Sequence, residues 1–144
     1  MTEIKRSALL PYPARFMYDI VNEVESYPDF LPWCGGAEIH QVDNTSMQAS
    51  VLIQAAGFNH WFRTRNVLVP GESIELKLVD GPFRELEGHW RFTSIDSEGS
   101  KIELALEFEF KRGFASAIIA PVFTRIANTL VDSFCDRARE LHER

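Results

Sequence analysis

The sequence predicts an α+β fold in which a curved antiparallel sheet of about six to seven strands wraps around one long C-terminal helix. Two patterns carry this prediction. Between residues 37 and 110, apolar and polar residues alternate with a period of two, which is typical of strands with one apolar and one solvated face. Residues 114–142 instead repeat apolar side chains every three or four positions, which indicates a helix long enough to cross a small sheet.

The individual elements follow in chain order. Residues 3–10 predict a first strand, and residues 13–27 predict a helix because Pro13 suits a first helical turn. The segment YPDFLPWCGG at residues 27–36 holds two prolines and two glycines, so we expect a helical turn and then a loop. Pro121 is expected to kink or break the last helix. The strands of the meander are expected near residues 37–43, 47–55, 59–69, 74–78, 84–92 and 101–110.

Length and composition limit the classes of protein to which the chain can belong. A chain of 144 residues fits one domain, residues 1–144. The net charge of −6, from 15 basic and 21 acidic residues, argues against a dedicated nucleic-acid surface but allows a local basic patch. No apolar run reaches the length of a membrane span, and the first residues have too short an apolar run for a signal peptide. These features predict a cytoplasmic protein.

No arrangement of residues for catalysis is present. No two histidines have metal-ligand spacing on one helix, and Cys34 and Cys135 form no CxxC pair. A nucleophilic Cys34 would need a base or a positive charge nearby, and the sequence supplies none, which favours an inert thiol. The acidic residues of 101–110 alternate with apolar ones, as on a solvated strand face. We therefore expect no enzyme activity and no metal site.

One basic pair has more than one interpretation. Arg63 and Arg65 share a predicted strand face with Trp61. An ordinary outer sheet face is the simplest interpretation. A polar patch at the mouth of a cavity and a strip that contacts RNA are the two alternatives.

Three blocks of the sequence resemble one protein family. They are VESYPDFLPWC at residues 24–34, VDGPFRELEGHWRF at 79–92 and PVFTRIANTLVDSFCDRA at 121–138. Over nearly its whole length the chain is similar to the START-like family (helix-grip, Bet v 1-like, or polyketide-cyclase-like), which includes the ribosome association toxin RatA and the mitochondrial coenzyme Q-binding proteins. The order of elements predicted above matches that fold.

The resemblance implies a hydrophobic tunnel between the sheet and the C-terminal helix, with residues 27–33 beside its mouth. The cyclase label of this family rests on fold likeness, and fold alone does not imply function. The residues expected at a ligand are Tyr27, Phe30, Leu31 and Trp33 from the loop, Trp90, Phe92, Leu104, Leu106 and Phe108 from the sheet, and Phe123, Ile126, Ala127, Leu130 and Phe134 from the helix.

The resemblance also implies the candidate functions. The first is the binding of ubiquinone or a similar polyprenyl lipid in support of respiratory electron transport, with no chemical step, no other cofactor and peripheral contact with the inner membrane. The alternative is a RatA-type toxin that binds the 50S ribosomal subunit and blocks formation of the 70S ribosome. Its RNA contacts would be Arg63, Arg65, Lys111 and Arg112, with no role for DNA. A cyclase-like enzyme acting on a small molecule ranks third.

Overall fold

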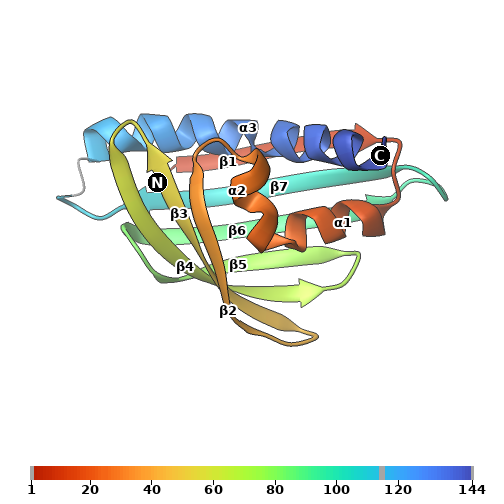
Figure 1. Cartoon of the computed structure of the whole chain (residues 1–144), viewed down its shortest axis with the longest axis horizontal. Coiled ribbons are helices and arrows are strands. Elements are labelled where there is room, and N and C mark those ends of the chain that lie inside the picture. The colour runs from red at the N-terminus through yellow and green to blue at the C-terminus, as the bar shows by residue number, and fades with distance from the viewer. Residues whose placement is uncertain (1, 114–115, 144) are drawn as a thin grey trace.

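The computed structural model describes residues 2–113 and 116–143, and it confirms the α+β helix-grip fold (Figure 1). Residues 114 and 115, part of the predicted last helix, lie outside the described residues. The elements are β1 (Thr2–Leu10), α1 (Ala14–Asn22), the 3-10 turn η1 (Val24–Ser26), α2 (Tyr27–Phe30), β2 (Cys34–Val42), β3 (Ser46–Ala55), β4 (Phe58–Val69), β5 (Ser73–Asp80), β6 (Phe83–Ser94), β7 (Ser100–Phe110) and α3 (Ser116–His142).

The seven strands form one antiparallel sheet in the order β1-β7-β6-β5-β4-β3-β2. Strands β2 to β7 are the predicted meander, and β1 joins the sheet beside β7, where Ile4 lies opposite Leu106. The alternation in β7 orients its side chains as expected: every second residue from Ile102 to Phe110 is buried, while the glutamates between them reach solvent. The core therefore lies on one face of the sheet.

Helix α3 covers only part of that face. It packs over β1 and β7, at one side of the sheet (Figure 1). Its buried stripe steps by three and four residues, as the sequence predicts, and consists of Ile119, Phe123, Ala127, Val131, Phe134 and Ala138.

Pro121 does not break α3, which runs through it from Ser116 to His142. A proline in a helix removes one backbone hydrogen bond, here the one to the carbonyl of Ala117. Ala117 is exposed, so water can take the place of the missing N–H.

Among the described residues, α3 is the one helix whose length and composition would allow it to cross a membrane. The sequence had predicted no such helix. The apolar stripe of α3 is packed against the sheet. Its position over the protein core accounts for its apolar composition.

The prediction of a single helix over residues 13–27 is wrong, because three short helical segments occupy this stretch. Helix α1 ends at Asn22, and Glu23 leaves the helical conformation with φ −85° and ψ 70°. The chain then turns through η1 and α2, and the Tyr27 hydroxyl donates a hydrogen bond back to the carbonyl of Val21. This bond holds the turn against α1.

The rest of the segment YPDFLPWCGG is less irregular than predicted. Strand β2 already begins at Cys34, and its two glycines permit a close approach to neighbouring strands. A Cβ atom on Gly36 would lie 2.9 Å from the Trp61 ring, and one on Gly35 would overlap the side chain of Gln54.

Part of the space between sheet and helix is filled by phenylalanine rings. Phe108 and Phe123 have ring centroids 4.7 Å apart, and Phe83 lies 5.1 Å from Phe123 and 4.6 Å from Phe110. Such close pairs add to the free energy of burying each ring. This part of the interior is solid core.

We expect Phe108→Ala to lower the free energy of unfolding by about 3–5 kcal/mol, because a ring that is 1% exposed leaves a cavity when it is removed. Urea denaturation measures this change. As a control, Leu9→Ala at a position 71% exposed should change stability by less than about 0.5 kcal/mol. A Phe108→Ala loss no larger than that of the control would contradict this account of the core.

Candidate functional site

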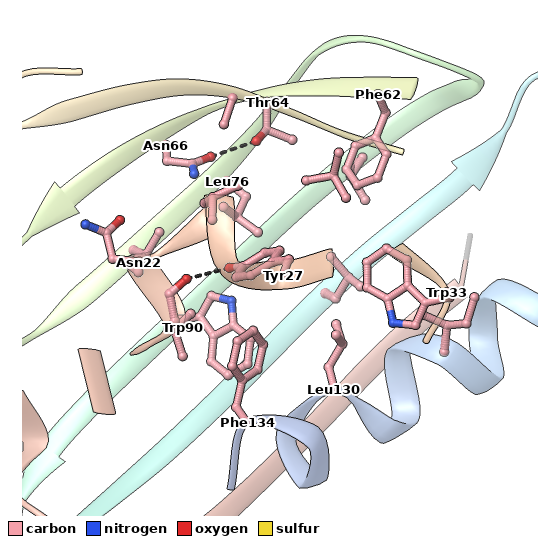
Figure 2. Close-up of a pocket in the computed structure, with 18 of the residues that line it drawn as sticks. Asn22, Tyr27, Trp33, Phe62, Thr64, Asn66, Leu76, Trp90, Leu130 and Phe134 are labelled. Atoms are coloured by element: carbon pink, nitrogen blue, oxygen red, sulfur yellow. Dashed lines mark hydrogen bonds between the residues drawn. The ribbon is translucent and has the colours of Figure 1, made fainter. Parts of the chain in front are cut away.

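A cavity of about 100 Å³ lies between the inner face of the sheet, the segment α1–α2 and helix α3 (Figure 2). Strands β3 to β7 supply its floor, and α3 closes one side. Its lining residues are Val21, Asn22, Val24, Tyr27, Trp33, Ala49, Val51, Phe62, Thr64, Asn66, Ile74, Leu76, Leu86, Trp90, Leu106, Phe123, Ile126, Leu130 and Phe134.

Aromatic rings form one wall of the cavity. The ring centroid of Phe134 lies 5.3 Å from that of Trp90 and 5.4 Å from that of Tyr27. Burial raises the pKa of Tyr27 above its usual range, and the nearby Cys34 adds to the effect. The phenol of Tyr27 is therefore neutral at physiological pH and is held by the Val21 carbonyl.

The cavity has one polar end, formed by Asn22, Thr64 and Asn66. The Thr64 hydroxyl donates a hydrogen bond of 2.8 Å to Oδ1 of Asn66, and these residues are 7% and 4% exposed. Oδ1 of Asn22 is buried and accepts no hydrogen bond from any residue that the structure describes. Figure 2 shows these three side chains far from Trp33, which lies toward the opposite end of the view.

Most of the aromatic and aliphatic residues predicted at a ligand do line the cavity. Their contact with a ligand stays a prediction. They are Tyr27, Trp33, Trp90, Leu106, Phe123, Ile126, Leu130 and Phe134.

The other predicted residues do not line this cavity, and their contact with a ligand also stays a prediction. They are Phe30, Leu31, Phe92, Leu104, Phe108 and Ala127. Leu104 and Phe108 belong to β7, over which α3 packs, and no gap is left there. Ala127 is fully buried on the stripe of α3, where its small side chain allows close packing.

The other three residues outside the lining pack against other parts of the protein. Phe92 packs between Trp90, with ring centroids 6.3 Å apart, and Tyr18, with ring centroids 5.6 Å apart. Phe30 packs against Phe134 at 5.5 Å, and the Arg137 guanidinium lies 5.0 Å from the centre of its ring. Leu31 is 1% exposed and belongs to the core beneath the turn.

Sequence reasoning missed the polar end of the cavity. Thr64 and Asn66 occupy inward positions of β4, between Phe62 and Leu68 on the same face. Two successive inward polar positions between apolar Phe62 and Leu68 are a signal that could have identified them. Asn22 gives no such signal, because a polar residue at the end of a helix is usually solvated.

Several apolar lining residues were also missed. Two of them lie in α1 and η1 and the others in β3, β4, β5 and β6, and none was predicted at a ligand. They are Val21, Val24, Ala49, Val51, Phe62, Ile74, Leu76 and Leu86.

Cys34 is buried beside this region. Its Sγ donates to the carbonyl of Gly36 at 3.3 Å, and burial raises the pKa of the thiol. A protonated thiol is a poor nucleophile, so the structure gives Cys34 no reactive character. Within residues 2–113 and 116–143, no group of three His, Cys, Asp or Glu side chains could hold a metal ion.

The outer face of the sheet carries the predicted basic pair. Arg63 and Arg65 lie on β4 on the same face as Trp61, whose side chain is 43% exposed. Arg65 lies opposite Lys77 of β5, and no ion pair to these three cations occurs among the described residues. Lys111 and Arg112 are exposed in the turn that follows β7.

Comparison with known proteins places this architecture in a family. The model of the family described as "Polyketide cyclase / dehydrase and lipid transport" matches residues 10–135. The chain belongs to this family. The resemblance found in the sequence is thereby confirmed.

Relatives within the family carry different names. The ribosome association toxin RatA of Pseudomonas aeruginosa is 46% identical over 98% of both chains. A mitochondrial coenzyme Q-binding protein of Schizosaccharomyces pombe is 22% identical, with 96% of this chain and 88% of the relative covered. The crystal structure of the ZhuI aromatase/cyclase of Streptomyces superimposes with a TM-score of 0.83 over 96% of this chain and 93% of that chain. Its sequence identity of 17% shows the fold alone.

The buried hydroxyl of Tyr27 predicts a specific pH dependence. Its pKa is higher in the folded than in the unfolded protein, where a tyrosine titrates near pH 10. Stability from the neutral phenol is therefore present below about pH 10 and lost as the pH rises further. We expect Tyr27→Phe to be less stable than the natural protein at pH 8, by about 1 kcal/mol for the lost hydrogen bond.

The difference between the two proteins should shrink above about pH 10, since only the natural protein has this hydroxyl to ionise on unfolding. Urea denaturation at pH 8 and at several values above 10 measures both curves. A difference that stays constant over this range would show that Tyr27 is not held neutral by burial.

Proposed function

We propose that this protein is a RatA-type factor that binds the 50S ribosomal subunit and hinders its joining with the small subunit. The observation that carries the proposal is 46% identity to a ribosome association toxin over 98% of both chains. The coenzyme Q-binding relative is only 22% identical. The order of functions suggested by the sequence is therefore reversed. Ribosome binding would take place in the cytoplasm.

The outer face of β4 and β5 supports a contact with ribosomal RNA. Like charges directly opposite each other destabilise a sheet, yet Arg65 and Lys77 occupy such a pair beside Arg63. A phosphate backbone would neutralise these cations, and the exposed ring of Trp61 could stack on an unpaired base. Most glutamates of the same face lie on β6 and β7, where Glu87 is opposite Lys77. Glu75 lies on β5 and Asp80 is opposite Arg63, so the basic strip is short and has acidic neighbours, as a net charge of −6 requires.

The cavity lining supports a binding role without a chemical step. It contains no carboxylate, imidazole, amine or guanidinium side chain. Its one titratable group is Tyr27, whose raised pKa keeps it protonated. General acid–base catalysis needs a group that gains and loses a proton near the working pH.

We expect purified protein added to ribosomes to move material from the 70S peak to the subunit peaks and to sediment with 50S subunits. A variant with Arg63, Arg65 and Lys77 all changed to Glu should bind 50S subunits at least about 10-fold more weakly and with a shallower dependence on salt. Sucrose-gradient sedimentation at several salt concentrations measures both effects.

The matched control changes Lys5, Arg84 and Lys101 to Glu, which alters the net charge equally on the half of the outer face formed by β1, β6 and β7. It should bind like the natural protein. No 50S binding by the natural protein would refute the proposed function. Equal binding by both variants would refute this surface as the contact.

A second candidate function is the binding of ubiquinone or another apolar molecule in the cavity. The coenzyme Q-binding relative and the apolar lining favour it. Ligand pockets usually measure about 300–1,000 Å³. The cavity, at about 100 Å³, has room for a ring but not for a polyprenyl tail.

Organic extraction of the purified protein, followed by mass spectrometry, tests this second function. A bound lipid should be recovered with the natural protein and reduced several-fold in Leu130→Trp, which fills the cavity from α3. Thr129→Trp, on the exposed side of the same helix, is the control and should retain the lipid. Absence of any lipid from the natural protein would contradict ubiquinone binding.

A further inference from the structure

We propose that the cavity binds a compact, uncharged ring compound that carries one hydroxyl group, with the hydroxyl between Asn22 and Asn66 and the ring against Trp90 and Phe134. This proposal deepens the second candidate function, because it assigns the chemical class of the ligand and the residues that select it. It does not depend on ribosome binding.

The size of the cavity sets the size of the ligand. A water molecule occupies about 30 Å³ in the liquid, and an apolar protein cavity of about 150 Å³ is known to take up benzene. The cavity of about 100 Å³ is smaller than that, so it limits the ligand to a single six-membered ring whose substituents are small. Phe134 and Trp90, whose ring planes are 89° apart, offer a face and an edge for such a ring to pack against.

The polar end of the cavity requires a hydrogen-bonding group on that ring. Oδ1 of Asn22 is buried without a partner among the described residues, and a buried acceptor in this condition is costly. A hydroxyl on the ligand would donate to it.

Asn66 provides the complementary contact. Thr64 holds Oδ1 of Asn66 through a hydrogen bond of 2.8 Å, and this bond leaves the amide nitrogen on the other side of the side chain. That nitrogen could donate to the oxygen of the same hydroxyl.

The absence of charge from the lining determines the charge of the ligand. No Asp, Glu, His, Lys or Arg occurs among the residues that form the cavity. An ion placed there would lose its hydration without gaining an ionic partner, which is strongly unfavourable. Carboxylates and amines are therefore poor ligands, while a phenol fits.

Binding of two probes of nearly equal shape tests the proposal. We expect p-cresol to bind at least about 10-fold more tightly than p-xylene, in which a methyl group replaces the hydroxyl. Benzoate at neutral pH should bind more weakly than either. Isothermal calorimetry or NMR titration of the full chain measures the three affinities.

Variants assign this preference to the polar end. Asn66→Leu and Asn22→Leu have similar volumes to the natural residues, and each should reduce the preference for p-cresol to less than about 3-fold while p-xylene still binds. Asn59→Leu, on the exposed face of the same strand β4, should leave the preference unchanged. Retained binding of p-xylene shows that a variant is folded.

Two sources of such a ring are distinguished by a further probe, 4-hexylphenol. Much tighter binding than p-cresol would identify the head of a tailed lipid as the source, and weaker binding would identify a free ring compound. The proposal is overturned if p-xylene binds as tightly as p-cresol, if neither binds, or if the preference survives in both Asn→Leu variants. None of these outcomes bears on 50S binding, which is measured by sedimentation.

Discussion

The structure depends on a mismatch of widths between one helix and seven strands. A helix with its side chains is about 10–12 Å wide, and neighbouring strands are about 4.8 Å apart, so one helix covers only two or three strands. Helix α3 covers β1 and β7, α1 lies over β6 and β7, and η1 and α2 pack on β2. The inner faces of β3, β4 and β5 are left facing an incompletely filled space. The cavity is the result of this geometry.

Strand β4 contributes to both candidate sites through its alternation. Its inward residues Phe62, Thr64 and Asn66 belong to the cavity, while Arg63 and Arg65 point outward between them. Neighbouring side chains of a strand project to opposite faces of the sheet. One strand can therefore line the cavity with its inward residues and contact a partner with its outward residues. The apolar interior and the proposed ribosome contact are therefore compatible within one chain.

The sequence predicted the architecture well because the period of each segment is a local property. It predicted which face of a strand turns inward, but it could not show how far each inward residue lies from the helix. Leu104 and Leu106 illustrate this limit: they share one face of β7, yet only Leu106 lines the cavity. The break at Glu23 escaped prediction for a related reason, since it is stabilised by a hydrogen bond from Tyr27 that exists only in the folded turn.

The pairing of β1 with β7 has a consequence for how the protein is made. Thr2 lies opposite Phe108, so β1 must wait for β7, the last of the seven strands, to be synthesised before it can pair. Contacts this distant in sequence slow folding, because a long loop must close before the pairing can stabilise it. The inner face of the growing sheet also stays uncovered until α3 has been synthesised. A nascent chain that stalls before α3 would thus expose a broad apolar surface and be prone to aggregation.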